Sequence, residues 1–487
     1  MTSLWLDGRT PEPTPPRIDH REYDDVIVGA GITGLATALR LAARGRSVVV
    51  LEARFAAAGA TGGSSAKVSV LQGTRLSTIA KHHPDSLVAA YALSAVEGQA
   101  WILDVARASG VAIEAAPAVT YAGSEDGAAA VMAEYAVARR IGLDVEWNAT
   151  SPLPFATYGS VLMRDQFQLD PVELVTALVR EFEALGGTLI EGVTATGVSA
   201  GSGTVHTSHG EFRGGSIVLA TGTPFLDRGL YFAKTQALRS YVQAFEFDDD
   251  LAPGMYLSAD VPTRSLRTAT RDGRRYLLVG GNGHPVGRHP SPALAQADLE
   301  HWTYRHFPEA RRTHAWSAQD YHSDDEIPFI GLLPRGRGRV WFATGFDKWG
   351  MTNGPAAAQR IAAEILGDEP PLWATVTGRR VTVPADLGEG IMAGLGVARN
   401  ALAGWVGAGA RMPEVPSEGQ GAVGRGAVAT STVDGLTCSL SAVCPHLGGI
   451  VSWNDAERSW DCPLHGSRFA ATGERLEGPA VRGLNPA

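Results

Sequence analysis

The clearest pattern of hydrophobic and polar positions lies over residues 23–53. Val26 to Val28 form a short apolar run that predicts a buried strand, and a glycine-rich turn follows it. Apolar residues then recur at helical spacing from Ile32 to Ala42, which predicts an amphipathic helix ended by Gly45. The run "SVVVLE" predicts a second buried strand. The order strand, tight turn, helix, strand is typical of an α/β domain.

The pattern continues through the middle of the chain. Apolar residues at helical spacing predict a second helix over 171–185, and strand-like segments follow it. Aromatic and β-branched residues mixed with turn signals over 237–334 predict an antiparallel sheet. A strand is expected over 339–346 and a helix over 354–367, with Pro355 near the start of that helix.

Both ends of the chain differ in composition from the middle. Residues 1–22 are Pro-rich and predict an extended N-terminal arm, without the basic and apolar blocks of a signal peptide. Residues 368–412 are rich in Gly, Pro and Ala and form the predicted linker. Short strands and turns are expected over 413–487, which predicts a small all-β domain at the C-terminus.

The bulk composition excludes several classes of protein. The chain has 487 residues and a net charge of −9 with dispersed basic residues, so a nucleic-acid partner is not expected. Its three Cys make no disulfide framework and favour a reducing, cytoplasmic compartment. No spanning helix is expected, because the most apolar segment, 390–410, contains Arg399 and Asn400. We expect that segment to pack on the protein, with contact to a membrane surface as the alternative.

The glycine turn after the first strand has the spacing of a dinucleotide site. Gly29 permits the tight turn, Gly31 lets a pyrophosphate approach the backbone, and Gly34 lets the helix lie close to the strand. The helix N-terminus supplies free N–H groups for the phosphates. Glu52 ends the second strand, where a carboxylate accepts both ribose hydroxyls and repels a 2′-phosphate. A glycine-rich turn without a ligand is the alternative interpretation.

Four separated stretches choose between FAD and NAD. They are the N-terminal fingerprint through "LEA", "GATGGSSAKVS" (59–69), "IVLATGTP" (217–224), and "DDEIPFIG" (324–331) followed by "FATGFDKWGMTNGP" (342–355). Together they resemble the D-amino-acid-oxidase-like superfamily of FAD-dependent amine and amino-acid oxidoreductases. The closest resemblance is to a bacterial subgroup whose flavoprotein carries a C-terminal iron–sulfur domain.

The resemblance implies an α/β, Rossmann-like FAD-binding domain interleaved with an antiparallel-sheet substrate domain, together spanning residues 23–367. The FAD-binding parts are expected at 23–75, 160–236 and 335–367, and the substrate parts at 76–159 and 237–334. The implied FAD contacts are Gly29, Gly31, Ile32, Thr33, Gly34, Glu52, Ala53, Thr61, Gly62, Ser65, Ala66, Ala195, Thr221, Gly222, Gly345, Trp349, Gly350, Met351 and Thr352.

Two Cys and two His form a compact pattern near the C-terminus. Cys444-x-His446 and Cys462-x-x-His465 resemble the Rieske motif, in which two thiolates hold one iron of a [2Fe-2S] cluster and two imidazoles hold the other. Zinc is the alternative, since two Cys and two His also bind zinc. Zinc sites usually pair Cys with Cys and His with His, whereas each loop here supplies one of each. The sequence therefore favours the cluster.

The motif departs from that of high-potential Rieske proteins. The positions that form a disulfide there are Gly449 and Leu464 here, and Phe469 stands where a Tyr is often found. Ser467 is retained as a hydrogen-bond donor to the cluster. Fewer donors leave the reduced cluster less stabilised, so a lower potential is expected. Cys438 matches no ligand position, and we expect it to be a small buried residue.

The predicted activity is oxidation of a C–N bond in a small amine or amino acid, with electrons relayed through the cluster to a one-electron carrier such as a ferredoxin. The candidate catalytic residues are Lys67, Lys348, Arg239 and Tyr241. Arg239 suits a substrate carboxylate, with an ordinary ion pair as the alternative. A structural role is favoured for His322. Two further functions remain open, namely a ferredoxin-fed reductase and an electron-transfer protein without a small substrate.

Overall fold

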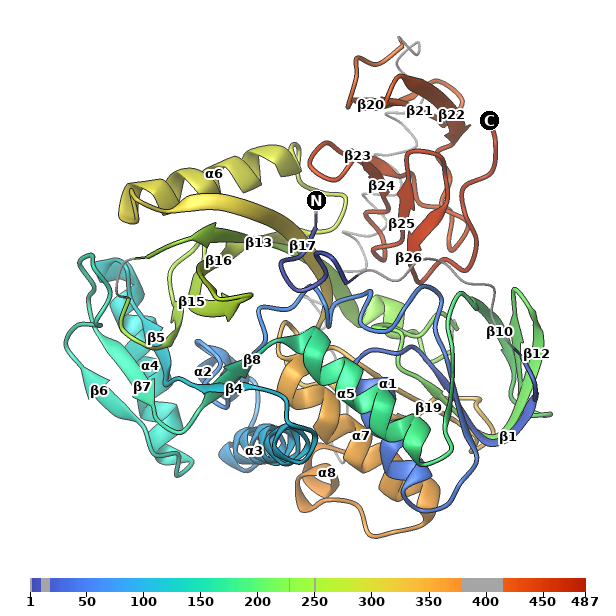
Figure 1. Ribbon diagram of the computed structural model, residues 1–487, viewed down its shortest axis with the longest axis horizontal. Helices are drawn as coiled ribbons and strands as arrows, with labels where there is room; N and C mark the ends of the chain where they lie inside the picture. Colours follow the sequence, from blue (N-terminus) through green and yellow to red (C-terminus); the bar gives the residue numbers. More distant parts are fainter. Residues whose placement is uncertain (1, 10–17, 227, 249–250, 379–414) are drawn as a thin grey trace.

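The computed structural model describes residues 2–9, 18–226, 228–248, 251–378 and 415–487. Two sheets form the body of the molecule, and the C-terminal β-domain lies against one side of both (Figure 1). The predicted segment 390–410 and the linker beyond residue 378 lie outside the described residues.

The first sheet contains the strand, turn, helix and strand predicted from the sequence. β1 pairs in parallel with β2 on one side and with β12 on the other. Val26 and Ile27 are fully buried because helices and strands cover both faces, as in parallel sheets generally. In spatial order the strands are β9 (Thr188–Ile190), β2 (Val48–Leu51), β1 (Glu22–Val28), β12 (Gly210–Leu219), β19 (Val340–Thr344) and β18 (Phe329–Leu332), with the hairpin β10 (Ala195–Ser199) and β11 (Thr204–Thr207) beside the start of β12.

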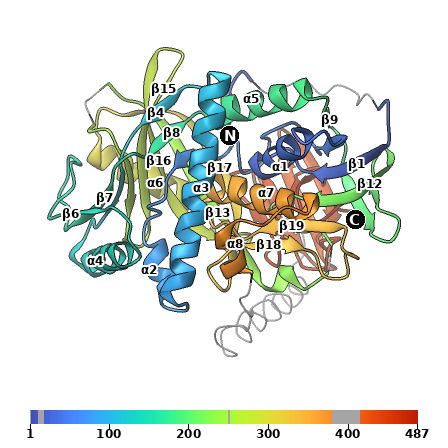
Figure 2. The same cartoon turned by 90° about the horizontal axis from the view of Figure 1, so that it is seen from below.

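Helices pack in a layer on this sheet (Figure 2). α1 (Ile32–Ala42) packs between α5 (Pro171–Ala184) and α7 (Gly350–Leu366), and α3 (Asp85–Ser109) packs against α7 and α8 (Leu372–Thr377). Two residues define the start of α5. The Asp170 carboxylate accepts from the N–H groups of Val172 and Glu173, and Pro171 occupies the first turn. The short strands β3 (Lys67–Val68), β8 (Phe167–Leu169) and β4 (Ile113–Ala115) form a small sheet beside these helices.

The second sheet carries the long strands predicted between 237 and 334, and its members are antiparallel except for the parallel pair β14 and β5. Its strands in spatial order are β17 (Arg311–Ser323), β13 (Thr235–Glu246), β16 (Arg274–Pro285), β15 (Arg264–Arg271), β14 (Met255–Ser258), β5 (Ala118–Tyr121), β7 (Ser160–Met163) and β6 (Glu146–Asn148). α6 (Pro292–His306), α2 (Arg75–Ala80), α4 (Glu125–Arg140) and the short 3-10 helix η1 (Tyr231–Ala233) lie around it.

The C-terminal domain is built from short antiparallel strands. One sheet contains β20 (Gly421–Gly424), β21 (Val428–Val433) and β22 (Leu436–Ser441), and the other contains β23 (Ser452–Asn454), β24 (Ser459–Asp461), β25 (Arg468–Ala470) and β26 (Arg475–Glu477). Trp460 and Phe469 are fully buried in its own hydrophobic core. Cys438 is half-buried on β22, so it is more accessible than expected.

Several boundaries differ from the expectations. α7 begins at Gly350 rather than 354, because the carbonyl of Thr352 packs closely on Gly98 of α3 and holds this turn in place. β7 belongs to the second sheet and β18 to the first, the reverse of their expected assignment. The linker does not start at 368, because α8 buries Trp373 against the helical layer.

The N-terminal segment is not an extended arm over its whole length. Leu4 and Trp5 are buried, and the Trp5 indole N–H donates to the carbonyl of Ser64 at 2.8 Å. The Ser3 hydroxyl donates to the carbonyl of Gly62 at 2.8 Å. Trp5 buries a large apolar surface, which favours packing of this segment on the protein despite the Pro-rich composition that follows it.

One described helix, α3, is long and apolar enough to cross a membrane by length and composition alone. Half of its most apolar window is buried inside the protein, and Glu97 on it accepts from the Trp373 indole at 3.0 Å. These contacts are those of a core helix, so α3 is weak evidence for a membrane span.

Candidate active site

The glycine turn between β1 and α1 has the tight backbone that the sequence predicts. Gly29 has a φ of +106°, and a Cβ there would lie 2.5 Å from the carbonyl oxygen of Ala220. A Cβ on Gly34 would lie 1.9 Å from the carbonyl oxygen of Gly29, so only glycine fits. A Cβ on Gly31 would meet only the Thr61 hydroxyl, at 3.2 Å. The space in front of Gly31 is therefore open enough for a ligand to approach the backbone.

Glu52 lies beside this turn at the end of β2. Its carboxylate accepts from the backbone N–H of Ala30 at 2.9 Å and from that of Arg54 at 2.9 Å. These two bonds fix the carboxylate at the cavity wall, where it can accept from ribose hydroxyls.

A cavity of about 530 Å³ runs from the glycine turn to the space between the two sheets. Its size suits a dinucleotide and a small substrate. Of the predicted FAD contacts, those that line it are Gly29, Gly31, Ile32, Thr33, Glu52, Ala53, Thr61, Ser65, Ala195, Thr221, Gly222, Trp349, Gly350 and Met351.

The other predicted contacts lie behind the cavity wall and support it. Gly34 allows close packing of α1 on β1, and a Cβ on Gly62 would lie 2.4 Å from the carbonyl oxygen of Ala57. Gly345 has a φ of +82°, and Ala66 is fully buried. The Thr352 hydroxyl accepts from the Gln72 side-chain amide at 3.1 Å.

The N-terminus of α7 points at the cavity. Gly350 and Met351 line it, and the N–H groups of a first helical turn have no partner within the helix. The turn before it is held by Asp320, whose carboxylate accepts from the Lys348 N–H at 2.5 Å. Lys348 has a φ of +72°, which is costly for a residue with a side chain. This end of α7 offers donors and partial positive charge to a ligand in the cavity.

Two lysines lie at the cavity wall, as predicted. The Lys67 ammonium donates to the Tyr256 carbonyl at 2.6 Å and to the Ser265 hydroxyl at 2.7 Å. Burial, with a smaller effect from Arg267, holds the pKa of Lys67 well below its usual value. The Lys348 ammonium lies close to Gly283. A Cβ placed on Gly283 would be 3.3 Å from Nζ of Lys348.

Arg239 and Tyr241 do not present their polar groups to the cavity. Side chains alternate along β13, so Leu238, Ser240 and Val242 face the cavity while the Arg239 side chain faces the other side of the sheet. The Arg239 guanidinium forms ion pairs with Glu457 and Glu477 of the C-terminal domain. The expectation that it binds a substrate carboxylate is corrected in favour of the ion pair.

Tyr241 is fully buried, and although it contributes to the cavity wall its hydroxyl pairs with Nε2 of His284 at 3.0 Å. Nδ1 of His284 pairs with the Pro285 carbonyl at 3.1 Å and must be the donor there. Nε2 therefore accepts the Tyr241 hydroxyl proton, and the Tyr241 hydroxyl is directed away from a substrate.

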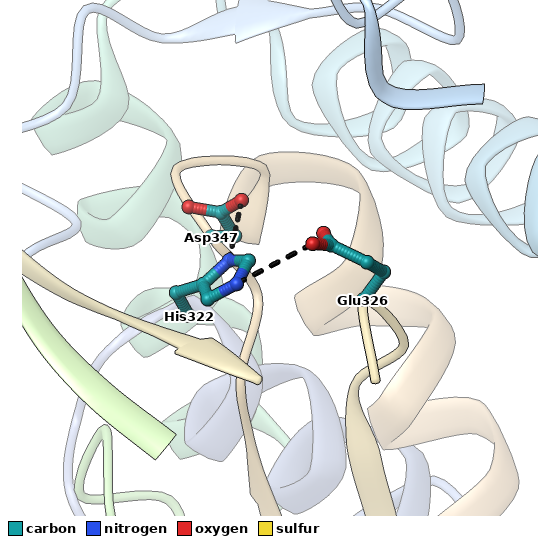
Figure 3. A group of neighbouring side chains, drawn as sticks. All are labelled: His322, Glu326 and Asp347. Atoms are coloured by element: carbon teal, nitrogen blue, oxygen red, sulfur yellow. Dashed lines mark hydrogen bonds and ion pairs between the residues drawn. The ribbon is translucent and has the colours of Figure 1, made fainter. Parts of the chain in front are cut away.

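His322 lies behind the turn at Lys348, between two carboxylates (Figure 3). Its Nδ1 is 3.1 Å from Asp347 and its Nε2 is 3.5 Å from Glu326. Arg75 pairs with both carboxylates, at 2.5 and 2.6 Å. Burial opposes a charged His322, but Asp347 outweighs it and raises the pKa of the imidazole. This buried ion-pair network positions the turn, which agrees with the structural role predicted for His322.

The four predicted cluster ligands lie on two loops with the same backbone hydrogen bonds. The N–H of Cys444 donates to the carbonyl of Gly449 at 2.8 Å. The N–H of Cys462 donates in the same way to the carbonyl of Ser467, five residues along, at 2.8 Å. Each Cys carbonyl accepts from the glycine four residues along, at 3.0 Å and 3.1 Å. Gly448 and Gly466 both have positive φ, and a Pro follows each Cys. Repetition of one loop geometry places the two Cys–His pairs face to face.

The chemistry of these loops suits a metal cluster. Backbone N–H groups two and three residues after each Cys are directed at its sulfur. The rings of His446 and His465 lie 5.1 Å apart, and burial, with smaller effects from His446 and Arg288, lowers the pKa of His465 to about 3. A neutral imidazole keeps a lone pair for a metal. Each loop supplies one thiol and one imidazole, as a Rieske cluster requires.

The loops meet where high-potential Rieske proteins have a disulfide. A Cβ on Gly449 would lie 2.7 Å from the Leu464 side chain, so these two positions are adjacent but carry no sulfur. Among the described residues all three Cys are free. The Ser467 hydroxyl bonds to Cys444 and accepts from the N–H of Ala480 at 2.9 Å.

The C-terminal domain docks against the two main sheets (Figure 1), and its ligand loops contact residues around the second sheet. The ring of Phe232, on η1, lies 5.0 Å from that of His465. The Gln319 amide donates to the carbonyl of Gly466 at 2.8 Å, and the Arg288 guanidinium donates to that of Pro463 at 3.0 Å. Sequence reasoning missed these residues and the cavity-lining segment 475–481, because they carry no local motif and acquire their positions only by docking.

Both sites fit the groups that the motifs imply. The cradle left by Gly31, the fixed carboxylate of Glu52 and the free end of α7 suit FAD, and the paired loops suit a [2Fe-2S] cluster.

Comparison with known proteins agrees with this interpretation. The sequence model "FAD dependent oxidoreductase" (DAO) matches residues 24–364, and that of the "Rieske [2Fe-2S] domain" matches residues 407–486. The chain is 30% identical over 480 residues to the Rieske 2Fe-2S iron-sulfur protein YhfW of Bacillus subtilis (strain 168), covering 95% of this chain and 93% of that one.

A shorter match covers the cluster region only. It is 53% identical over 45 residues to the cytochrome b6-f complex iron-sulfur subunit of Synechococcus sp. (strain JA-3-3Ab), covering 9% of this chain and 26% of that one.

Solved structures share the fold of the oxidoreductase domain. Glycine oxidase from Geobacillus kaustophilus superposes with a TM-score of 0.61 at 20% identity, covering 72% of this chain and 96% of that one. L-proline dehydrogenase from P. horikoshii superposes with a TM-score of 0.60 at 16% identity, covering 74% and 99%. The chain belongs to the DAO family of FAD-dependent oxidoreductases and carries a C-terminal Rieske domain, so it binds FAD and a [2Fe-2S] cluster.

Proposed function

We propose that the protein oxidises a C–N bond of a small amine or amino acid and relays the electrons to its Rieske cluster and on to an external carrier such as a ferredoxin. FAD supplies a two-electron acceptor and the [2Fe-2S] cluster a one-electron acceptor. The observation that carries the proposal is the bond from Gln319, which lines the FAD cavity, to Gly466 in the cluster loop. One side chain therefore contacts both sites.

The residues that would hold the two groups follow from the geometry. We propose that Cys444, His446, Cys462 and His465 hold the cluster, because these four alone complete the two matching loops. Gly29 and Gly31 with the N-terminus of α1 would hold the pyrophosphate of FAD, and Glu52 its ribose.

The substrate would lie on the side of the cavity formed by the second sheet. Glycines at 280, 281 and 283 of β16 line the cavity there. An amine must lose its proton before oxidation, and we propose that Nζ of Lys67 accepts that proton from the substrate ammonium. Its lowered pKa supports this role, since a neutral Nζ has a lone pair for the proton.

Two related facts support the substrate class and the compartment. The superposed glycine oxidase and L-proline dehydrogenase bear the names of enzymes that act on amino acids. The absence of a sulfur pair at Gly449 and Leu464 suits a reducing, cytoplasmic compartment.

The direct test is anaerobic titration of the full-length protein with a panel of amines and amino acids. Bleaching of the FAD absorbance and appearance of the reduced-cluster EPR signal are recorded together. We expect at least one amine to reduce both centres. If reduced ferredoxin reduces both centres while no amine reduces either, the proposed direction of electron flow is wrong.

A further inference from the structure

The Rieske domain forms part of the wall of the FAD cavity. Residues 475–481, from β26 into the following loop, line the same cavity as the glycine turn at the other end of the sequence. Their neighbours across the cavity include Glu52, Arg54 and Thr194. Arg475 lies near Glu52, whereas Glu477 pairs with Arg239 of β13.

Arg475 is a charged residue of this wall that lies near Glu52, at the expected ribose end of the cavity. Its Nη2 donates to the Thr194 hydroxyl at 3.1 Å. Glu52 acts on it electrostatically, yet both Glu52 oxygens already accept from backbone N–H groups. A guanidinium carries five N–H donors in a planar fork that suits phosphate and hydroxyl oxygens. Thr194 accepts from one of them, and Arg475 lines the cavity.

We propose that Arg475 of the Rieske domain is an FAD-binding residue, which donates to ribose or phosphate oxygens in the adenosine half of the dinucleotide. The loop 478–481 completes the wall beside it. The FAD site is thus assembled from both domains, and it is complete only when the Rieske domain is docked.

The position of this wall depends on the cluster loops and the domain contact. The N–H of Ala480 donates to the Ser467 hydroxyl at 2.9 Å, and Ser467 bonds to Cys444. Glu477, two residues after Arg475, pairs with Arg239 of β13 at 2.8 Å. A ligand that binds one arrangement of the domains stabilises that arrangement. Bound FAD should therefore stabilise docking of the Rieske domain, and docking should tighten FAD.

The competing interpretation is that Arg475 only neutralises Glu52 and never contacts FAD. Removing it would then leave FAD affinity unchanged, or raise it by freeing the carboxylate for the ribose. The two interpretations predict opposite results in a binding experiment.

The test measures the FAD dissociation constant of the full-length protein from the fluorescence of FAD released on dilution. A charge-assisted hydrogen bond has a strength that corresponds to roughly 10- to 100-fold in affinity, and Arg475→Ala should raise the constant by that factor. The FAD dissociation constant of Arg475→Lys should lie between those of the wild type and Arg475→Ala, because lysine retains the positive charge but lacks the planar fork of N–H donors. Thr194→Val, which changes no residue of the Rieske domain, should raise the constant by a smaller factor.

The matched control is Arg482→Ala, which removes the same charge from an exposed position of the same segment. Its FAD constant should stay within about twofold of the wild type. The cluster EPR signal should be unchanged in every variant, which shows that the Rieske domain is folded. Equal constants for Arg475→Ala and Arg482→Ala would overturn the proposal.

The coupling has its own readout in thermal unfolding of the cluster domain, followed by loss of the cluster's visible absorption. Removing FAD should lower the midpoint temperature of this unfolding in the wild type, and should lower it by a smaller amount in Arg475→Ala. Equal decreases in the two proteins would contradict coupling through Arg475.

Discussion

The guanidinium of Arg239, on β13 of the second sheet, donates to the carboxylate of Glu477 in the Rieske domain at 2.8 Å. Arg239 is 1% exposed, so the pair is shielded from water. Glu477 and Glu457 also pair with Arg468 of the Rieske domain. Because removing one member leaves buried charge uncompensated, this network holds the two domains in one arrangement.

Arg239→Ala should therefore destabilise the docked protein by about 3–5 kcal/mol, the usual cost of breaking a buried ion pair. The measurement is urea unfolding followed by tryptophan fluorescence. Arg274→Ala is the matched control, because Arg274 on the same sheet pairs with Glu246 at an exposed position and should cost less than about 1 kcal/mol. Similar losses in both variants would show that the domain contact adds no stability.

Cys462→Ser should abolish the cluster EPR signal, because it removes one of two buried thiols that face each other. FAD absorbance and its bleaching by substrate should remain, since the FAD cavity contains neither Cys. Cys438→Ser is the control and should keep the signal, because Cys438 lies on β22 away from the ligand loops. Loss of FAD reduction in Cys462→Ser would contradict separate centres.

Lys67→Met should slow reduction of FAD by substrate by roughly 100-fold or more, the usual contribution of a general base. Stopped-flow absorbance under anaerobic conditions measures this rate. The variant should also shift the pH profile, because the group that takes the substrate proton is lost. Lys81→Met, at an exposed position, should leave the rate unchanged. A normal rate and pH profile in Lys67→Met would assign Lys67 a structural role only.

Glu134 should make folding stability depend on pH. Its carboxylate caps α2 by accepting from the N–H groups of Leu76 and Ser77, and burial raises its pKa from 4.5 to about 7. The folded protein thus holds this proton more tightly than the unfolded chain. The stabilisation is complete below pH 4.5 and is lost as the pH rises through about 7.

Glu134→Gln should not lose stability in this way as the pH rises. Between pH 4.5 and about 7, the free energy of unfolding of the wild type should therefore fall relative to that of the variant by up to about 3 kcal/mol. Urea unfolding at several pH values measures it. Glu125→Gln, exposed on the same helix, should follow the wild type. A constant difference between Glu134→Gln and the wild type across the interval would refute the assignment.

Local motifs account for much of the site. Gly29, Gly34 and Glu52 lie where their spacing predicts, because the chain between them is short and its geometry is set by one strand, one turn and one helix. The C-terminal loops are equally local, since Cys444 and Cys462 each fold a turn with its own Pro and Gly.

Side-chain direction on long strands was harder to predict. The second sheet was expected, but the Arg239 guanidinium pairs with Glu477 and the Tyr241 hydroxyl with His284, because alternation along β13 tells which residues share a face and not which face borders the cavity. The burial of the N-terminal segment was not predicted, for another reason. Its Pro-rich composition indicates an extended arm, whereas Trp5 is buried against a partner, Ser64, far along the chain.

The sequence by itself determined the two cofactor classes and the order of the domains, because glycine turns and ligand loops are short-range features encoded by neighbouring residues. Only the tertiary structure decided how the domains meet. The pairing of Arg239 with Glu477 and the entry of Arg475 into the FAD cavity each join residues more than two hundred positions apart. Such contacts depend on the docking of two separately folded surfaces, and no local pattern of residues specifies that.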